Sequence, residues 1–190
     1  MLAETVRNKW NQRWREAESA PRPARVLSDY SHLLPKAGEA LDLACGLGGN
    51  ALFLAERGLD TQGWDISEEA VSRLESLAGR LPLKAVVRDV EAVPPEPESF
   101  DVIVVSHFLY RPLFGPLAEA LRPGGLLFYQ TFTEEKTPGG AGPRNPDYLL
   151  RPNELLDAFR GLRVLAYREE GTVGDCARGM RNEALLVARR

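Results

Sequence analysis

Short apolar runs alternate with amphipathic stretches along most of the chain, and this alternation predicts strands and helices in turn. Strands are expected at residues 39–45, 59–66, 83–88, 100–106 and 126–132. The run Phe100–Ser106 is almost entirely apolar, as expected for a central strand covered on both faces. Alternating β and α units of this length imply a parallel, doubly wound sheet.

Apolar positions recur at helical spacing between these strands. Helices are expected over residues 50–57, 67–78 and 115–121. Ser67 is a suitable N-cap, and Gly79 stands where the apolar stripe of that helix ends.

The tail of the chain does not follow this alternation. Residues 162–167 and 184–188 are strand-like, and the segment 168–183 between them holds several glycines and no helical stripe. A parallel crossover normally needs a helix, so an antiparallel hairpin is the simpler interpretation. The expected fold class is therefore α/β, a Rossmann-like doubly wound sheet with helices on both faces, mostly parallel, with one antiparallel strand near the C-terminus.

The 190 residues fit a single domain. We expect an N-terminal helical cap over residues 1–35, with helices at 4–18 and 24–34, and a cofactor-binding core over 39–132. A flexible loop over 133–148 and a C-terminal helix with a β-hairpin over 149–190 follow. The loop is rich in glycine and proline and comes directly after a strand, which is typical of a lid or substrate loop; a mobile surface loop is the alternative.

Composition narrows the class of partner. The net charge of −3 provides no basic field for nucleic acid. Two cysteines and two histidines, scattered along the chain, make neither a disulfide framework nor a zinc site. No signal-peptide pattern and no apolar run of about 20 residues occurs, so a cytoplasmic protein without membrane association is expected. An exposed edge strand would allow a monomer or a homodimer.

A glycine-rich turn between the first strand and the next helix predicts a nucleoside cofactor. Gly46 and Gly48 let the backbone turn sharply and approach a ligand, and the following helix presents free N–H groups. Gly46-x-Gly48-x-x-Ala51 fits the dinucleotide fingerprint, and Asp65 stands where a ribose-binding acid belongs. Asp65 could therefore hold the ribose of NAD or of S-adenosylmethionine, or it could serve only as a helix-entry residue.

Three features favour S-adenosylmethionine. Asp42, just before the glycines, would repel a pyrophosphate but can bind an ammonium group or ordered water. The reversed strand at the tail is unusual for a dinucleotide domain, and 190 residues leave no length for a hydride-acceptor domain. A NAD(P)-binding oxidoreductase and a non-catalytic S-adenosylmethionine-binding module remain the alternative hypotheses.

The segment Leu41–Asn50 resembles motif I of class I S-adenosylmethionine-dependent methyltransferases, hydrophobic–Asp–hydrophobic–Gly–Cys–Gly–x–Gly, with Ala44 in place of the first glycine. The resemblance runs from about Glu39 to Arg190. It implies a seven-stranded sheet with one antiparallel strand, S-adenosylmethionine as the cofactor and S-adenosylhomocysteine as the product. The details, including the N-terminal Trp10-Asn-Gln-Arg-Trp14, are most similar to the small tellurite-resistance methyltransferase group.

The resemblance implies roles at matching positions. Asp65 would bind the ribose hydroxyls, Ile66 would pack on adenine, Asp89 would accept from the adenine amino group, and Val90 would pack beside it. Asp89 could instead cap a loop. The candidate cofactor-binding residues are Trp10, Arg13, Trp14, Asp42, Ala44, Cys45, Gly46, Gly48, Asn50, Asp65, Ile66, Asp89, Val90 and Ser106.

The resemblance also implies positions for the glycines of the loop and for the N-terminal tryptophans. Gly46 and Gly48 would back the methionine moiety, with Ser106 near that end of the cofactor. The N-terminal tryptophans would fold over the site, with Arg13 reaching the methionine carboxylate; a helix packed on the sheet is the alternative.

The reaction expected is an in-line SN2 displacement, in which the protein mainly aligns the reactants. A neutral nucleophile needs a base, whereas a thiolate or selenide-like anion needs none. His107 titrates in the useful range and is the first catalytic candidate, with Tyr110 the second; a structural histidine is the alternative. The Asn-Pro-Pro-Tyr sequence of amino-group nucleic-acid methyltransferases is absent. The expected partner is a small-molecule acceptor: a chalcogen oxyanion, a thiol or another small metabolite.

Overall fold

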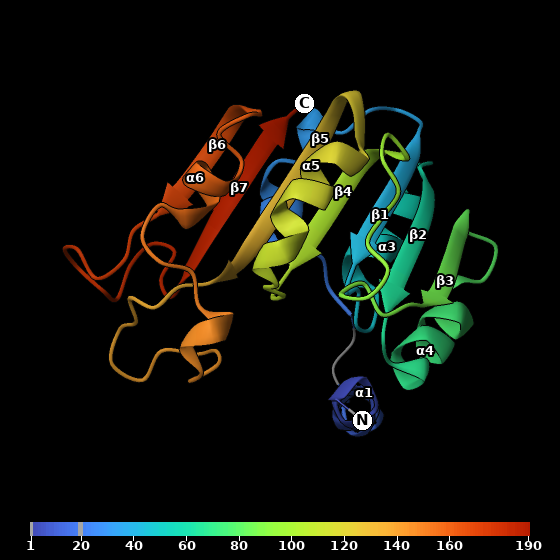
Figure 1. Ribbon diagram of the computed structural model, residues 1–190, viewed down its shortest axis with the longest axis horizontal. Coiled ribbons are helices and arrows are strands. Elements are labelled where there is room, and N and C mark those ends of the chain that lie inside the picture. Colours follow the sequence, from blue (N-terminus) through green and yellow to red (C-terminus); the bar gives the residue numbers. More distant parts are fainter. Residues whose placement is uncertain (1, 19–20) are drawn as a thin grey trace.

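Seven strands form one continuous sheet in the computed structural model, which describes residues 2–18 and 21–190 (Figure 1). Their order is β3-β2-β1-β4-β5-β7-β6. The strands are β1 (Glu39–Leu43), β2 (Asp60–Asp65), β3 (Leu83–Val87), β4 (Phe100–Ser106), β5 (Leu121–Phe132), β6 (Arg163–Glu169) and β7 (Glu183–Arg189). Residues 1 and 19–20 of the expected N-terminal cap lie outside the described residues.

One strand of this sheet runs against the others. β1 to β5 pair in parallel, whereas β7 is antiparallel to both of its neighbours, β5 and β6. The predicted hairpin and the predicted Rossmann-like, mostly parallel fold are confirmed. Because β7 is reversed, its first residue, Glu183, pairs with Phe132 at the carboxyl end of β5.

Helices cover both faces of the sheet. α2 and α3 lie behind it in Figure 1, and α5 and α6 lie in front. The helices are α1 (Leu2–Arg15), α2 (Arg25–Asp29), α3 (Gly49–Ala55), α4 (Glu68–Ala78), α5 (Phe114–Ala120) and α6 (Glu154–Ala158), with 3₁₀ turns η1 (Ser31–Leu33), η2 (Arg111–Leu113) and η3 (Pro146–Tyr148).

The apolar run of β4 is explained by this double covering. Ile103 and Val105 pack in the cluster beneath α5 and α6, whereas Val102 and Val104 pack beneath α2 and α3. All four side chains are fully buried. A strand with both faces covered needs no polar positions, which is why its sequence shows no alternation.

The observed boundaries differ from the expected ones at several elements, and two of these differences have a local cause. The helix expected over 24–34 breaks into α2 and η1, since the hydroxyls of Ser28 and Ser31 donate to the carbonyls of Arg25 and Ser28 and compete with the helical pattern. β5 begins at Leu121 rather than at the expected residue 126, and a register shift against β4 accommodates the Pro-Gly-Gly sequence.

The connection from β3 to β4 contains no helix. Instead the Arg88 guanidinium lies over the Trp64 ring, 3.9 Å from its centroid, and Trp64 meets Phe100 edge to face. Trp64 is 2% exposed. This aromatic side chain, together with the Arg88 stem, covers the part of the sheet that a crossover helix would otherwise cover.

α2 is anchored by side chains from distant segments rather than by its own N-cap. The backbone N–H of Ala24 donates to Asn50 Oδ1 at 2.7 Å, and that of Val26 donates to Gln130 Oε1 at 2.7 Å. The chain just before α2 also passes so close to Gly49 that a β-carbon there would lie 2.1 Å from the Arg22 carbonyl oxygen. α2 therefore depends on the glycine loop and on β5 for its position.

Phe159 should be a principal contributor to stability. It is 1% exposed and its ring lies 5.4 Å from that of Phe114 and 5.9 Å from that of Tyr129. We expect Phe159→Ala to lower the free energy of unfolding by about 3–5 kcal/mol, measured by urea denaturation. A loss below about 1 kcal/mol would contradict this packing.

Candidate functional site

The segment after β1 folds into a tight loop at the carboxyl end of the strand. Gly46 and Gly48 have φ of +53° and +78°, and Gly48 is the N-cap of α3. Ala44 also has a positive φ, +56°, a conformation that costs an L-residue roughly 1 kcal/mol relative to glycine. The backbone thus adopts the geometry of the glycine motif even at the position where alanine stands.

Asp42 is completely buried beneath this loop. Its Oδ2 accepts from the Ala51 N–H at 3.0 Å, and its Oδ1 accepts from Asn50 Nδ2 at 3.1 Å. Burial raises the pKa of Asp42 to about 7, against the lowering effect of both hydrogen bonds. The carboxyl group occupies the first turn of α3, so the expected free N–H groups there are partly taken by the protein itself.

Asp65, at the end of β2, ties that strand to the glycine loop. Its Oδ2 accepts from the Gly46 N–H at 2.8 Å and its Oδ1 from the Ser67 N–H at 2.9 Å. The side chain is 6% exposed, and burial raises its pKa against the effect of these two hydrogen bonds. Each carboxylate oxygen retains lone-pair capacity for a ligand hydroxyl.

The third acid, Asp89, follows β3. Its Oδ1 accepts from the N–H groups of Glu91 and Ala92, at 3.1 and 3.4 Å, so one oxygen caps the loop as the alternative interpretation proposed. Val90 is buried in the cluster beneath α5, and Ile66 is half-buried. The ends of β2 and β3 therefore present two acids and two apolar side chains near the glycine loop.

Ser106 is joined to this loop by a hydrogen bond. Asn50 Nδ2 donates both to Ser106 Oγ, at 3.0 Å, and to Asp42. The carboxyl ends of β1 and β4 are thus connected through the side chain of Asn50, and Cys45 beside them is buried and unoxidised.

α1 lies beyond the carboxyl ends of the strands and beside α4 (Figure 1). Asn11 Oδ1 accepts from Ser67 Oγ at 2.7 Å, and Arg15 pairs with Glu69 at 2.6 Å. Arg73, on α4, donates to the carbonyls of Trp14 and Ala17. These contacts hold α1 across the opening of the glycine loop.

The Trp14 ring lies directly on the loop. A β-carbon at Gly46 would stand 2.7 Å from Cζ2 of Trp14, so the indole touches the glycine backbone. Trp14 Nε1 is buried and, within the described residues, makes no hydrogen bond. A buried N–H left in this state costs about 1–3 kcal/mol and is available to a ligand.

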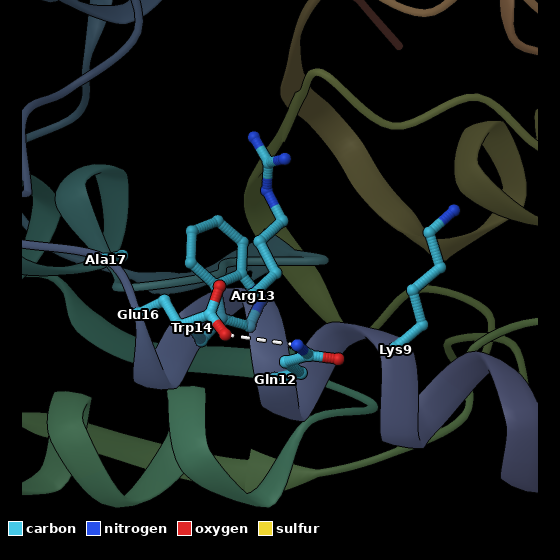
Figure 2. Close-up of a pocket in the computed structure, with 6 residues that line it drawn as sticks. All are labelled: Lys9, Gln12, Arg13, Trp14, Glu16 and Ala17. Carbon is cyan, nitrogen blue, oxygen red and sulfur yellow. Dashed lines mark hydrogen bonds between the residues drawn. The ribbon is translucent and has the colours of Figure 1, made fainter.

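A cavity of about 460 Å³ lies along α1, and Figure 2 shows the residues that line it. Its lining residues are Lys9, Gln12, Arg13, Trp14, Glu16 and Ala17. Trp10 and Trp14 stack with their ring centroids 5.8 Å apart, and the Arg13 guanidinium lies 5.6 and 5.8 Å from the two rings. The Arg13 and Lys9 side chains extend from the same side of the helix in Figure 2, and the Glu16 carboxylate, which also lines the cavity, accepts from Gln12.

His107 follows Ser106 and lies over the end of β5, where its backbone N–H donates to the Gln130 carbonyl. Its Nε2 lies 3.1 Å from Glu183 Oε1, and its ring stacks on Phe132. Tyr110 is half-buried against the cluster beneath α5. Of the two catalytic candidates, His107 is the one that has an acidic partner.

Several residues that shape this region carried no sequence signal. Asn11, Gln130 and Glu183 contact partners 53 to 104 positions away. Such distant pairings depend on the sheet order and on the docking of α1, and no local pattern encodes either.

Within residues 2–18 and 21–190, no three His, Cys, Asp or Glu side chains gather as metal ligands. Over the same ranges, no helix combines the length and apolarity needed to cross a bilayer. A second cavity, of about 550 Å³, is lined by residues of η2, α5, α6 and the segment just before α6, including Arg111 and Glu154, and none of the predicted site residues lines it.

The donor set suits an adenosine-type ligand better than a dinucleotide. The loop offers its backbone, Asp65 offers carboxylate oxygens for hydroxyls, and Trp14 offers a buried N–H without a partner. Asp42 already accepts from the Ala51 N–H in the first turn of α3, the turn that receives the pyrophosphate in dinucleotide domains.

Comparisons with known proteins agree with this geometry. Residues 40–125 match the protein-family model described as a methyltransferase domain. A ubiquinone biosynthesis O-methyltransferase from Aliivibrio fischeri (strain MJ11) is 29% identical over 173 residues, which cover 78% of this chain and 71% of that protein. YqeM of Bacillus subtilis (strain 168) is 28% identical over 113 residues, 54% of this chain.

The fold is also shared with solved structures. TehB from Haemophilus influenzae matches with a TM-score of 0.71 and 22% identity, over 93% of this chain and 65% of that chain. The match to YqeM spans 46% of that protein's length, about half of it.

The raised pKa of Asp42 predicts a pH dependence of stability. Between about pH 4 and 7 the folded protein keeps a proton on Asp42 that the unfolded chain has released. The free energy of unfolding should therefore fall as pH rises through this range. Asp42→Asn should reduce that slope, measured by urea denaturation at pH 5 and pH 8.

Asp60→Asn is the control for this experiment, because Asp60 is exposed and begins β2, at the end of the strand away from the glycine loop. Because the pKa of Asp65 is also raised, the Asp42→Asn variant should keep a residual slope, smaller than the slope of the parent protein. Identical slopes in Asp42→Asn and the parent protein would refute the assignment.

Proposed function

Because the chain belongs to the class I S-adenosylmethionine-dependent methyltransferase superfamily, we propose that it is an enzyme that transfers a methyl group to a small molecule. S-adenosylmethionine is the cofactor that this superfamily implies. It supplies a methyl group activated by a positively charged sulfur, and the protein's contribution is binding, alignment and the management of the acceptor's proton.

The observation that carries this proposal is the position of Asp42. Its carboxyl group, buried under the glycine loop, holds the Ala51 N–H in the first turn of α3. In dinucleotide domains that turn receives the pyrophosphate, so the arrangement favours a cofactor without one.

We assign the cofactor's parts to the residues that surround the loop. Gly46 and Gly48 would support the methionine moiety, and Ser106 would lie near it. Asp65 would accept from the ribose hydroxyls through the lone pairs that Gly46 and Ser67 leave free. The remaining assignments are Asp42, Ala44, Cys45 and Asn50 to the loop that holds the methionine, and Ile66, Asp89 and Val90 to the adenine.

α1 would form a cover that closes over this cofactor. Trp14 touches Gly46 on a face where the methionine moiety would also lie, and two groups cannot occupy that face together. Binding therefore requires α1 to shift, after which Trp14 Nε1 and Arg13 would be available to the cofactor, and the stacked Trp10 would move with Trp14.

The acceptor is proposed to be a small molecule with an oxygen nucleophile. The Aliivibrio relative, which covers most of this chain, is named as an O-methyltransferase, and this supports oxygen over sulfur or a chalcogen oxyanion. The net charge of −3 gives no support to a nucleic-acid acceptor.

Two measurements test the proposal. Isothermal titration with S-adenosylmethionine, and separately with NAD and NADP, identifies the cofactor. A panel of phenols, carboxylates, thiols, amines, selenite and tellurite, assayed for release of S-adenosylhomocysteine, identifies the acceptor class. Binding of NAD(P) alone would overturn the proposal, and binding of S-adenosylmethionine without turnover of any acceptor would favour a non-catalytic binding module.

Asp65→Ala should weaken the binding of S-adenosylmethionine by about 1–3 kcal/mol, about 5- to 150-fold in Kd, because the ribose hydroxyls lose their buried acceptor. Isothermal titration measures the change. Asp60→Ala, at the exposed start of the same strand, is the matched control and should bind normally. Equal affinity of Asp65→Ala and the parent protein would place the ribose elsewhere.

Trp14→Ala should speed the association of S-adenosylmethionine at least about five-fold, because the ring that covers Gly46 is removed and less apolar contact holds α1 closed. Stopped-flow mixing measures the rate constant. Glu4→Ala, at the exposed start of α1, is the control and should leave the association rate unchanged. An unchanged or slower association would show that α1 does not obstruct the cofactor.

A further inference from the structure

His107 and Glu183 form a pair at the carboxyl edge of the sheet, from segments 76 residues apart. His107 follows β4 and Glu183 begins β7, and Nε2 lies 3.1 Å from Oε1. The His107 side chain is 45% exposed and that of Glu183 is 20% exposed. The carboxyl group is therefore mostly shielded, while the imidazole reaches solvent.

The pair is held in place from several directions. His107 has a φ of +54°, which is rare for a non-glycine residue, and its ring stacks on Phe132 with centroids 4.8 Å apart. Gln130 Nε2 donates to the second oxygen of Glu183, and Gln130 Oε1 accepts from the Val26 N–H of α2. A strained backbone supported by stacking and by a second hydrogen-bonded layer is typical of a functional position.

This arrangement fixes which nitrogen of His107 carries the proton. Burial raises the pKa of Glu183, but the hydrogen bonds from His107 and Gln130 outweigh it, so the pKa lies below its usual value and the carboxyl is ionised. An ionised carboxylate only accepts hydrogen bonds, so Nε2 must be the donor. When the ring is neutral, its lone pair is then on Nδ1.

The pair lies at the base of the two long loops on this edge. Thr133 donates its N–H to the Asn182 carbonyl, and Thr137 donates to Asn182 Oδ1 at 2.8 Å. Asn182 directly precedes Glu183, so the loop after β5 and the loop before β7 meet beside the pair. An acceptor bound between these loops and the cofactor would lie near His107.

We infer that Glu183 is a positioning residue that holds His107 as a general base, and that the acceptor is a neutral hydroxyl compound rather than a preformed anion. This inference rests on the proposed function. The acceptor oxygen forms a bond to the methyl carbon while its proton passes to His107 Nδ1. The electron pair of the broken carbon–sulfur bond stays on sulfur, leaving neutral S-adenosylhomocysteine, and the imidazolium later releases its proton to water.

The first test compares, at pH 7.5, an acceptor that must lose a proton during methyl transfer with an acceptor that is already ionised. Catechol is the neutral hydroxyl probe, and an acidic aryl thiol, already ionised, is the anionic probe. His107→Ala should lower kcat for catechol by about 10²- to 10⁴-fold and leave kcat for the thiol within about three-fold. The Kd of S-adenosylmethionine, measured by titration, should not change.

Glu183→Gln should lower kcat for catechol about ten-fold or more, with a smaller effect on KM, and Glu183→Asp should recover part of the loss. Glu75→Gln removes the same charge from an exposed position on α4, away from both loops, and should have no effect. Thermal unfolding of each variant identifies any loss that comes from misfolding.

The second test needs neither cofactor nor acceptor. The chain has two histidines, His32 and His107, so imidazole ¹⁵N spectra are readily assigned with the help of His107→Ala. The parent protein should show His107 protonated on Nε2. Glu183→Gln should shift the tautomer toward Nδ1–H, because a glutamine amide can donate to Nε2.

The outcomes separate this inference from the proposed function. Normal cofactor binding with thiol turnover, but with catechol turnover absent or unaffected by His107→Ala, overturns the base and leaves the transferase. An unchanged tautomer in Glu183→Gln overturns the positioning role. Failure to bind S-adenosylmethionine overturns the proposed function itself, and bound cofactor without turnover of either probe counts against both.

Discussion

The buried carboxyl group of Asp42 is the constraint on which the site depends. It joins β1 to the first turn of α3 and, through Asn50, to Ser106 at the end of β4. The same asparagine accepts from Ala24 ahead of α2. Removing such a group from water is costly unless its hydrogen bonds are made, so the glycine loop, α2 and β4 are held in one arrangement.

Much of the fold could be predicted from the sequence because its signals are local. The apolar run of β4, the N-cap Ser67 and the glycines after β1 each report on a few neighbouring residues. The reversed strand β7 followed from the absence of a helix before it. The same logic placed Asp65 at the end of β2 beside the glycine loop, where the Gly46 N–H donates to it.

The rest of the site depends on contacts that no local pattern encodes. The resemblance implied that Trp14 would fold over the site, but the sequence could not show that its ring rests on Gly46, because that depends on how α1 docks against α4. Likewise, His107 could be named as a candidate, but Glu183 could not be named as its partner. That pairing arises only when β7 is inserted beside β5. For Asp89, by contrast, the sequence did indicate an observed contact, because one of its oxygens caps the loop that follows it in the chain.

The direction of β7 has a consequence for how this family of sheets can diversify. β1 to β4 carry the predicted site residues at or just after their final positions, so a length change in the loop that follows each strand begins at the predicted residue. Glu183 instead has its loop before it and its strand after it, and the ladder to β5 fixes its position. Insertions or deletions in residues 170–181 could therefore reshape the proposed acceptor side over evolutionary time while the Glu183 carboxylate stays in register.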